Sequence, residues 1–341
     1  MDLPFAHGGP PLIGRLRATP EDFRVTEILG YAADGEGEHV LLDVEKREAN
    51  TAWVAGELAR FAGVKPMAVG YAGLKDRHAV TRQAFSVQLA GREEPDWSAF
   101  PHAGVRILSS ARHRRKLKRG ALEANDFVLV MRDVQGDRER AEDVLSAIAE
   151  RGVPNYFGEQ RFGHGGANVE RARAMFAGRR MDRATRSILL SAARSQIFNE
   201  VLATRVRDGN WDQAIDGEVW CLAGSHARFG PEAFTDVLRQ RLTEGDIHPS
   251  GPLWGRGDLP TQAQARQLEQ GAVAAWRDLA TGLEQAGLEQ ERRPLRLIPR
   301  HLHWRWLDET SLELSFRLPP GTYATVLMRE LADAPQQASI S

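Results

Sequence analysis

The sequence predicts an α+β fold in which a part rich in strands is interrupted by a mainly helical segment. Strand patterns gather in residues 22–132 and return in 300–318, whereas helical spacing dominates 152–297. The chain has 341 residues, which is long for a single hydrophobic core. Strands separated by a helical block indicate a domain with an insertion, so we expect two domains.

Apolar residues with a period of two predict the strands in chain order. The alternation is loose in 23–28, regular in 40–44 and regular again in 85–89. Residues 127–131 form a continuous apolar run, which is typical of a central strand. The alternation returns in 312–318, directly before a Pro-Pro-Gly turn.

Apolar residues at helical spacing predict the helices. The first runs through Phe61 and has Thr51 as its expected cap. Two more are expected in 138–150 and 186–206, and Thr261 is expected to open a long one. The predicted helix after Thr261 continues through Leu279, and a short helix ends at Leu331.

Composition is that of an ordinary globular protein, with 42% hydrophobic and 27% charged residues and a net charge of −1. A single cysteine, Cys221, cannot form an internal disulfide, which fits a reducing cytoplasm. Its apolar surroundings indicate a buried side chain rather than a nucleophile. We expect no signal peptide and no membrane span, because no apolar stretch approaches the roughly 20 residues that a span needs.

Motifs for the common cofactors are missing from the sequence. It contains no phosphate-binding loop, no dinucleotide fingerprint and no H-E-x-x-H zinc motif. It also lacks the G-x-S-x-G elbow of hydrolases, and one cysteine cannot build a thiolate zinc site. We therefore predict no metal and no nucleotide cofactor.

Residues 70–83 contain the most unusual candidate for catalysis, Asp76, which lies between Lys75 and Arg77. Nearby cations favour the carboxylate form of an aspartate, and an ionised carboxylate on a loop between strands can act as a nucleophile or base. From these residues alone, a turn or capping aspartate is the commoner interpretation.

Two clusters of basic residues indicate a polyanionic partner. Residues 112–119 hold a dense run of arginine and lysine, and 292–305 mix arginines with histidine and tryptophan. A polyanion relieves the repulsion within such a run, and aromatic rings can stack on RNA bases. The alternatives are a solvated loop for the first cluster and a strand with a cationic outer face for the second.

A series of segments, taken in chain order, resembles the TruD family of tRNA pseudouridine synthases. Each segment alone is a weak signal, but the ordered set is specific and covers almost the whole chain. The matching segments are 20–27, 73–81, 116–120 with 125–127, 152–163, 191–199 and 318–325.

The resemblance implies a pseudouridine-synthase catalytic domain with a mixed, mainly antiparallel sheet, formed by residues 1–151 and 298–341. A mostly helical α/β domain of the TRUD type, residues 152–297, is inserted into it. The implied reaction is the isomerisation of uridine to pseudouridine at position 13 of tRNA, without a cofactor. The resemblance implies tRNA as the substrate and partner. We predict no obligate protein partner, and the single cysteine predicts a cytoplasmic location.

By the same resemblance, Asp76 supplies the catalytic carboxylate, which either attacks the ribose or removes a ribose proton. Its partner cation is expected among Lys75, Arg77 and Arg17. The acceptor of the C5 proton stays open, because the family accepts Phe or Tyr at the position of Tyr323. The expected substrate-binding residues are Phe23, Asn125, Tyr323, Phe127, Arg17 and Lys75.

Two other classes of function compete with the isomerase. One is an RNA-binding protein or RNA chaperone on the same fold, for which a poised carboxylate has no use. The other is a small-molecule hydrolase that uses Asp76 and has no dependence on a polyanion. RNA binding weakens steeply with salt, so the salt response separates the last class from the first two.

Overall fold

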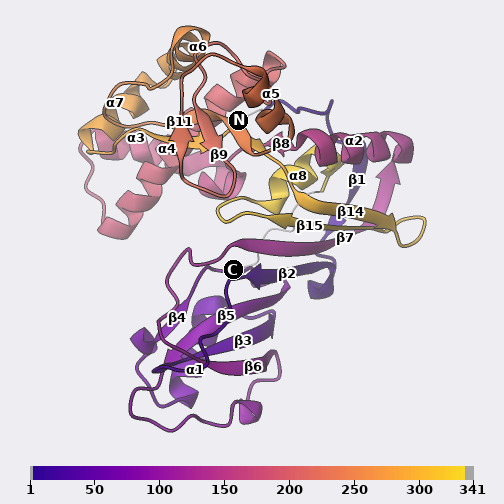
Figure 1. Ribbon diagram of the computed structural model, residues 1–341, viewed down its shortest axis with the longest axis vertical. Coiled ribbons are helices and arrows are strands. Elements are labelled where there is room, and N and C mark those ends of the chain that lie inside the picture. The colour runs from indigo at the N-terminus through magenta and orange to yellow at the C-terminus, as the bar shows by residue number, and fades with distance from the viewer. Residues whose placement is uncertain (1–2, 335–341) are drawn as a thin grey trace. The chain divides into compact units, whose positions relative to one another are not determined.

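The computed structural model describes residues 3–334 and confirms the α+β class (Figure 1). The chain divides into two compact units. The sheet unit contains residues 11–138, 299–322 and the described part of the segment that begins at 332. The helical unit contains the described residues up to 10 together with 139–298 and 323–331. The predicted boundaries of the catalytic and inserted domains stay a prediction, and residues 335–341 of the former lie outside the described residues.

The sheet unit is built on one sheet of ten strands with the central order β14-β15-β7-β2-β5-β3-β6. β1 pairs with β7 and β16, and β4 pairs with β5. The pairs β2–β5 and β1–β16 are parallel and the other pairs are antiparallel, so the sheet is mixed and mainly antiparallel, as predicted. Its strands are β1 (Leu12–Leu16), β2 (Phe23–Ile28), β3 (His39–Arg47), β4 (Val69–Tyr71), β5 (Val80–Gln88), β6 (Val105–His113), β7 (Ala124–Gly136), β14 (Arg300–Trp306), β15 (Leu312–Leu318) and β16 (Ala332–Asp333).

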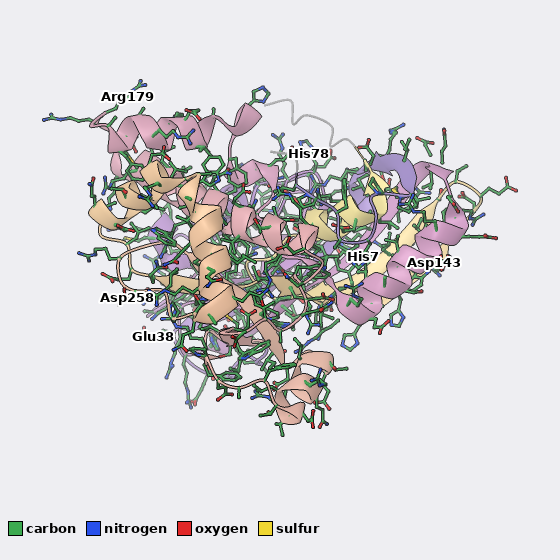
Figure 2. All side chains as sticks on the ribbon, turned by 90° about the horizontal axis from the view of Figure 1, so that it is seen from above. His7, Glu38, His78, Asp143, Arg179 and Asp258 are labelled. Carbon is green, nitrogen blue, oxygen red and sulfur yellow. The ribbon has the colours of Figure 1, made fainter. Side chains whose placement is uncertain are left out.

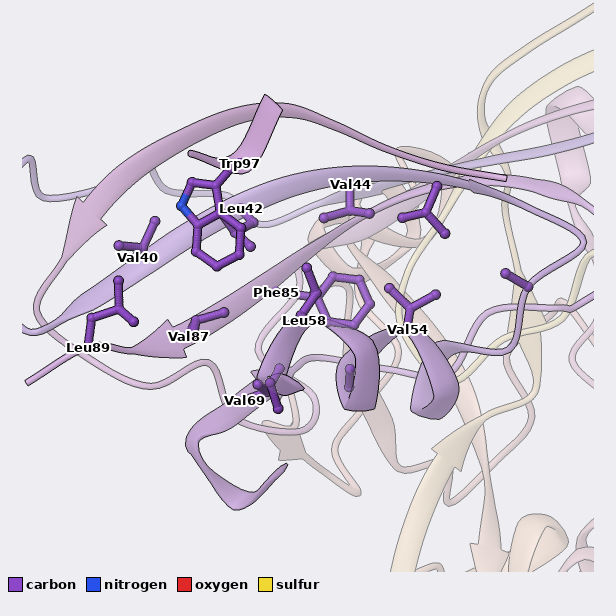
Figure 3. Close-up of a cluster of buried hydrophobic side chains, with 14 residues drawn as sticks. Val40, Leu42, Val44, Val54, Leu58, Val69, Phe85, Val87, Leu89 and Trp97 are labelled. Atoms are coloured by element: carbon purple, nitrogen blue, oxygen red, sulfur yellow. The ribbon is translucent and has the colours of Figure 1, made fainter. Parts of the chain in front are cut away.

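Helix α1 (Thr51–Phe61) covers one face of this sheet and closes its core. The alternating residues Val40, Leu42 and Val44 of β3 belong to one buried cluster with Val54 and Leu58 of the helix (Figure 3). Full burial of one such side chain stabilises a fold by about 1.5–3 kcal/mol. The period-two patterns of the sequence therefore identified the buried face of this sheet.

The first turn of α1 differs from the prediction in one way that affects the candidate site. Asn50 is the capping residue, because its side chain accepts a hydrogen bond from the amide of Ala52. Thr51 is the first helical residue and is buried. Its hydroxyl is therefore used for other contacts, which are described below.

The helical unit packs its helices around the long helix α4, whose residues Leu189, Ala193 and Ile197 are fully buried. Its small sheet has the order β10-β9-β11-β12, and β13 pairs with β8. The helices are α2 (Arg138–Arg151), α3 (Ala167–Phe176), α4 (Arg183–Arg207), α5 (Asp236–Thr243), α6 (Ala263–Ala274), α7 (Arg277–Gln285) and α8 (Ala324–Leu331). The strands are β8 (Val153–Pro154), β9 (Trp220–Leu222), β10 (Arg228–Phe229), β11 (Ile247–Leu253), β12 (Glu291–Pro294) and β13 (Arg296–Leu297).

The single long helix expected after Thr261 is wrong. The chain forms two helices, α6 and α7, separated at Trp276, whose backbone (φ −122°, ψ 27°) is not helical. Cys221 is buried in β9, as expected, and burial raises the pKa of its thiol. Among the described residues, no helix is long and apolar enough to cross a membrane.

Candidate active site

The loop between β4 and β5 carries Asp76 and is fixed by bonds from its neighbours. The hydroxyl of Thr51 accepts a hydrogen bond from the amide of Lys75 at 3.0 Å. The same hydroxyl donates to Oε1 of Gln83 at 3.0 Å, and Nε2 of Gln83 donates to the carbonyl of Gly73 at 3.3 Å. The start of α1 and the strand β5 thus hold the loop backbone on both sides of Leu74.

Lys46 supports the same loop from the interior of the sheet unit. Its side chain is fully buried at the end of β3, and its ammonium donates to the carbonyl of Ala49 at 2.7 Å and to the carbonyl of Asp76 at 3.1 Å. Burial lowers the pKa of Lys46 to about 8, the charge of Asp76 opposes this shift, and the charge of Lys75 adds to it. A buried cation therefore lies directly behind the backbone of Asp76.

The carboxylate of Asp76 is paired with Arg17. Nη2 of Arg17 donates to Oδ2 of Asp76 at 2.7 Å, and 46% of the Asp76 side chain is exposed. The guanidinium also lies 4.1 Å from the centre of the Phe23 ring. Arg17 has a φ of +58°, which an arginine adopts at a cost of about 1 kcal/mol or more. The strained backbone presents the guanidinium to the carboxylate and to the ring.

Lys75 is directed away from Asp76 and into the sheet. Its ammonium donates to Oε2 of Glu27 at 2.6 Å, and both side chains are almost completely buried. The other oxygen of Glu27 accepts from the amide of Ala84 at 3.3 Å. The cation next to the Asp76 carboxylate is therefore Arg17, the third of the three expected candidates, and Lys75 anchors the loop to β2.

One face of the sheet brings together the predicted aromatic and amide residues of this unit. Phe127 of β7 lies edge-on to Phe23 (6.3 Å between ring centres, 82°) and stacks on Phe316 (5.4 Å, 19°). Asn125 lies opposite Glu27 in the register of β2 and β7. Its Oδ1 is buried and has no hydrogen-bond partner among residues 3–334. An unsatisfied buried acceptor costs about 1–3 kcal/mol, so this position favours a ligand with a donor group.

Tyr323 belongs to the helical unit, directly before α8. Its hydroxyl accepts a hydrogen bond from Nη2 of Arg161 at 2.8 Å, and Nη1 of Arg161 donates to the hydroxyl of Ser191 at 3.0 Å. Arg161 and Ser191 come from segments 152–163 and 191–199 of the family resemblance. Those motifs therefore hold the ring of Tyr323 in place.

Some arginines of the two basic clusters singled out in the sequence are paired with acidic residues. In 112–119, Arg112 pairs with Glu94, His113 with Asp34 and Arg114 with Glu36. In 292–305, Arg292 pairs with Glu269 inside the helical unit, and Arg305 pairs with Glu313. The expectation that the two clusters bind a polyanion stays a prediction.

The structure adds two charged residues that the sequence had not identified as part of the site. Lys46 continues the alternation of Val40, Leu42 and Val44 on the buried face of β3. Glu27 continues the alternation of Phe23 and Val25 in the same way. A charged residue at the next buried position of an apolar alternation was the available signal.

The described residues contain no group of three or more His, Cys, Asp or Glu side chains that could hold a metal ion. The polar groups around Asp76 are instead two cations, an amide and a hydroxyl. This set can orient a carboxylate and bind a polar planar ligand on an aromatic face.

Replacement of Arg17 by Met is expected to lower catalytic turnover by about 10- to 100-fold, because a charge-assisted hydrogen bond contributes roughly 1.5–3 kcal/mol. Arg17→Lys should lose less, since it retains the charge. The matched control is Arg15→Met on the same segment, whose guanidinium pairs with the exposed Asp133 at 3.1 Å. Turnover of Arg17→Met equal to that of the Arg15 control would remove this cation from the site.

The fold is shared with a solved structure of a distant protein. The crystal structure of a Methanosarcina mazei protein provisionally named tRNA pseudouridine synthase D aligns with a TM-score of 0.74 over 97% of this chain and 98% of that chain. Sequence identity in this alignment is 20%. This chain therefore has the same fold as the Methanosarcina mazei protein.

The sequence comparisons then give the family. The model of the family described as "tRNA pseudouridine synthase D (TruD)" matches residues 4–169 and 167–331. The tRNA pseudouridine synthase D of Xanthomonas euvesicatoria is 53% identical over 97% of this chain and 94% of the relative. Those of Methylococcus capsulatus and Aeromonas hydrophila are 49% and 48% identical with the same coverage. The chain belongs to the tRNA pseudouridine synthase D (TruD) family.

Proposed function

We propose that this chain isomerises uridine to pseudouridine at position 13 of tRNA, with Asp76 as the nucleophile and without a cofactor. Family membership gives the isomerisation of uridine in tRNA. The observation that carries the assignment of Asp76 is its half-exposed carboxylate, held at 2.7 Å by Arg17 on a loop that Lys46 and Thr51 fix from behind. The carboxylate can approach the ribose only after the uridine has left the stack of RNA bases, and this unstacking costs a few kcal/mol.

The reaction breaks the bond between ribose C1′ and uracil N1 and forms a bond between C1′ and C5; C5 loses its proton and N1 gains one, so substrate and product are isomers. No group is oxidised and none is transferred from another molecule, so the balance of the reaction requires no cofactor. The ionised carboxylate of Asp76 attacks C1′, or removes the C2′ proton to give a glycal intermediate. Arg17 serves both routes, because it orients and stabilises the carboxylate.

The base is recognised by the face of the sheet that carries Phe23, Asn125 and Phe127. Uracil offers an N3–H donor between two carbonyl acceptors, and a side-chain amide has the complementary acceptor and donor. The buried, unsatisfied Oδ1 of Asn125 supports this pairing. The rings of Phe23 and Phe127 supply the apolar surface, and Tyr323 of the helical unit is proposed as a further substrate-binding residue, together with Arg17 and Lys75.

We further propose residues 1–151 and 298–341 as the catalytic domain and 152–297 as the inserted domain. The mixed sheet of the sheet unit and the helix-rich composition of the helical unit support this division. The proposed partner is tRNA, the proposed location is the cytoplasm, and no obligate protein partner is proposed.

The test of cofactor independence uses tRNA that carries tritium at C5 of its uridines. The purified chain, dialysed against a chelator, is expected to release one tritium per modified site without any added cofactor. The release should continue to completion at excess tRNA, since nothing is consumed. If release requires an added metal ion or nucleotide, the cofactor-free mechanism is wrong; if no release occurs under any condition, the proposed activity is wrong.

A further inference from the structure

In the described part of the helical unit, ten arginines form an ion pair with a carboxylate of the same unit. Both buried and exposed arginines are among them. The paired arginines are Arg151, Arg173, Arg194, Arg205, Arg207, Arg239, Arg241, Arg256, Arg292 and Arg329. A group of exposed arginines that has no carboxylate partner among the described residues can instead meet an external anion.

Such a group lies at the connection from α3 to α4. Arg179, Arg180, Arg183 and Arg186, hereafter the arginine corner, are all exposed, and no ion pair joins any of them to a carboxylate of the described chain. Figure 2 shows the labelled Arg179 with its side chain extending away from the ribbon. The four guanidinium groups fall within eight residues of sequence, so their charges act together.

The one acidic residue within this segment, Asp182, is used by the backbone. Its Oδ1 accepts from the amide of Thr185 at 2.9 Å, and its Oδ2 accepts from the hydroxyl of Thr185 at 2.5 Å. These bonds lower the pKa of Asp182, and they make it the cap of α4. Both oxygens of its carboxylate therefore accept hydrogen bonds from Thr185, and no ion pair joins them to an arginine of the arginine corner among the described residues.

The backbone that carries the arginine corner is well defined. Gly178, with a φ of +102°, ends α3, and its amide donates to the carbonyl of Met175 at 3.0 Å. The amide of Arg179 donates to the carbonyl of Ala174 at 3.0 Å, which completes a Schellman-type end of the helix. Arg183 and Arg186 are three residues apart in the first turn of α4, so they share one side of the helix.

The placement of the arginine corner is unfavourable for the isolated protein. The first turn of α4 contains no acidic residue, and the positive end of the helix dipole adds to the charges of Arg183 and Arg186. Repulsion among these groups weakens when an anion binds and releases its counterions. Phosphate groups spaced along a nucleic-acid backbone fit a row of guanidinium groups, each of which can form two parallel hydrogen bonds.

We propose that the arginine corner binds phosphate groups of the tRNA backbone and supplies substrate affinity that the Asp76 loop does not. The proposal rests on the proposed function, because it takes tRNA as the polyanion. The arginine corner contributes to binding of the whole tRNA and takes no part in the isomerisation. Its loss therefore raises KM and leaves kcat unchanged.

The test replaces all four arginines by glutamine and measures turnover and binding of unmodified tRNA at several salt concentrations. KM is expected to rise at least about 10-fold at physiological salt, and the slope of log K against log salt should fall by about 2–4, with roughly 0.7–0.9 for each lost phosphate contact. The matched control replaces four acid-paired, partly exposed arginines of the same unit, Arg207, Arg239, Arg241 and Arg256. The control should keep KM within about 2-fold, because these arginines are paired with carboxylates of the same chain and such surface ion pairs contribute little to stability.

Two half-variants, Arg179→Gln with Arg180→Gln and Arg183→Gln with Arg186→Gln, keep the test valid if the fourfold variant folds poorly. Each is expected to produce part of the change in slope. An unchanged slope and KM in both, or an equal change in the control, would overturn the proposal. One result separates this proposal from the proposed function. If replacing the arginine corner lowers the salt dependence of tRNA binding but the parent chain forms no pseudouridine, the proposed function is wrong and the binding surface is still supported.

Discussion

Asp76→Asn is expected to form no measurable pseudouridine, with kcat reduced by at least about 10⁴-fold, a loss typical of the removal of a nucleophile. The amide is nearly the same size, so Arg17 and the loop stay in place, but it carries no negative charge to attack the ribose or take its proton. Binding of tRNA should stay within about 3-fold of the parent, since Asp76 is one acidic residue facing a polyanion. Tritium release and filter binding measure the two quantities separately.

The matched control for this variant is Asp43→Asn. Asp43 of β3 also accepts from an arginine, Arg82, on the same sheet, and its side chain is partly exposed. It is expected to keep kcat within about 2-fold, because a surface ion pair contributes only about 0–1 kcal/mol. Equal losses in both variants would mean that general disruption of the sheet, and not the chemistry of Asp76, explains the first result.

Lys46→Met should reduce kcat about 100-fold while KM changes by less than about 3-fold, because the hydrogen bond to the carbonyl of Asp76, the bond to the carbonyl of Ala49 and a buried charge behind the loop are lost together. The lysine touches no part of the substrate in this account, so it is a positioning residue. Methionine matches its length and apolar stem but leaves the carbonyls of Ala49 and Asp76 without this donor, so the free energy of unfolding of the variant is measured beside its kinetics. Lys65→Met, at an exposed lysine, is the control for loss of charge.

The same variant has a specific signature in the pH profile. The pKa of Lys46 is lowered from 10.5 to about 8, so the parent should lose kcat as the pH rises through about 8, when the ammonium loses its proton. This loss is not unfolding, since between these two values the unfolded chain binds more protons than the folded chain and stability rises with pH. The Met variant should lack this alkaline step. An identical step in both would exclude Lys46 as its origin.

The elements that the sequence predicted well are those in which burial repeats with a fixed period. The alternations of 40–44 and 312–318 became β3 and β15, and the helical spacing of 186–206 became most of α4. The helix expected after Thr261 was interrupted at Trp276, because an apolar stripe can continue across a change of helix axis. Periodicity therefore predicts which face is buried and does not predict where one helix ends and the next begins.

The cation that pairs with Asp76 was only one of three candidates in the sequence, because proximity in sequence does not decide which charges meet. Arg17 lies 59 residues before Asp76 and is its partner, whereas the adjacent Lys75 bonds to Glu27. Neighbours in sequence point to different sides of an extended chain, so the nearest cation in sequence was the less suitable candidate. Tyr323, Asn125 and Phe127 came from the family resemblance, and residue patterns alone would have placed them in a core or a turn.

Density of charge along the sequence was also a weak guide to free charge. The run 112–119 is denser than the segment that holds the arginine corner, yet its Arg112 and Arg114 are paired with carboxylates from distant segments. Pairing depends on which side chains the fold brings within about 4 Å, and that information is not local. The structure is therefore needed to decide which basic residues can meet RNA.

The most direct test of the account is carbodiimide mapping of pseudouridine in unmodified tRNA that has been incubated with the purified chain. The account predicts one new pseudouridine, at position 13, in the sample treated with the parent protein and none in the sample treated with Asp76→Asn. No new pseudouridine in any tRNA, or the same new pseudouridine produced by Asp76→Asn, would contradict it.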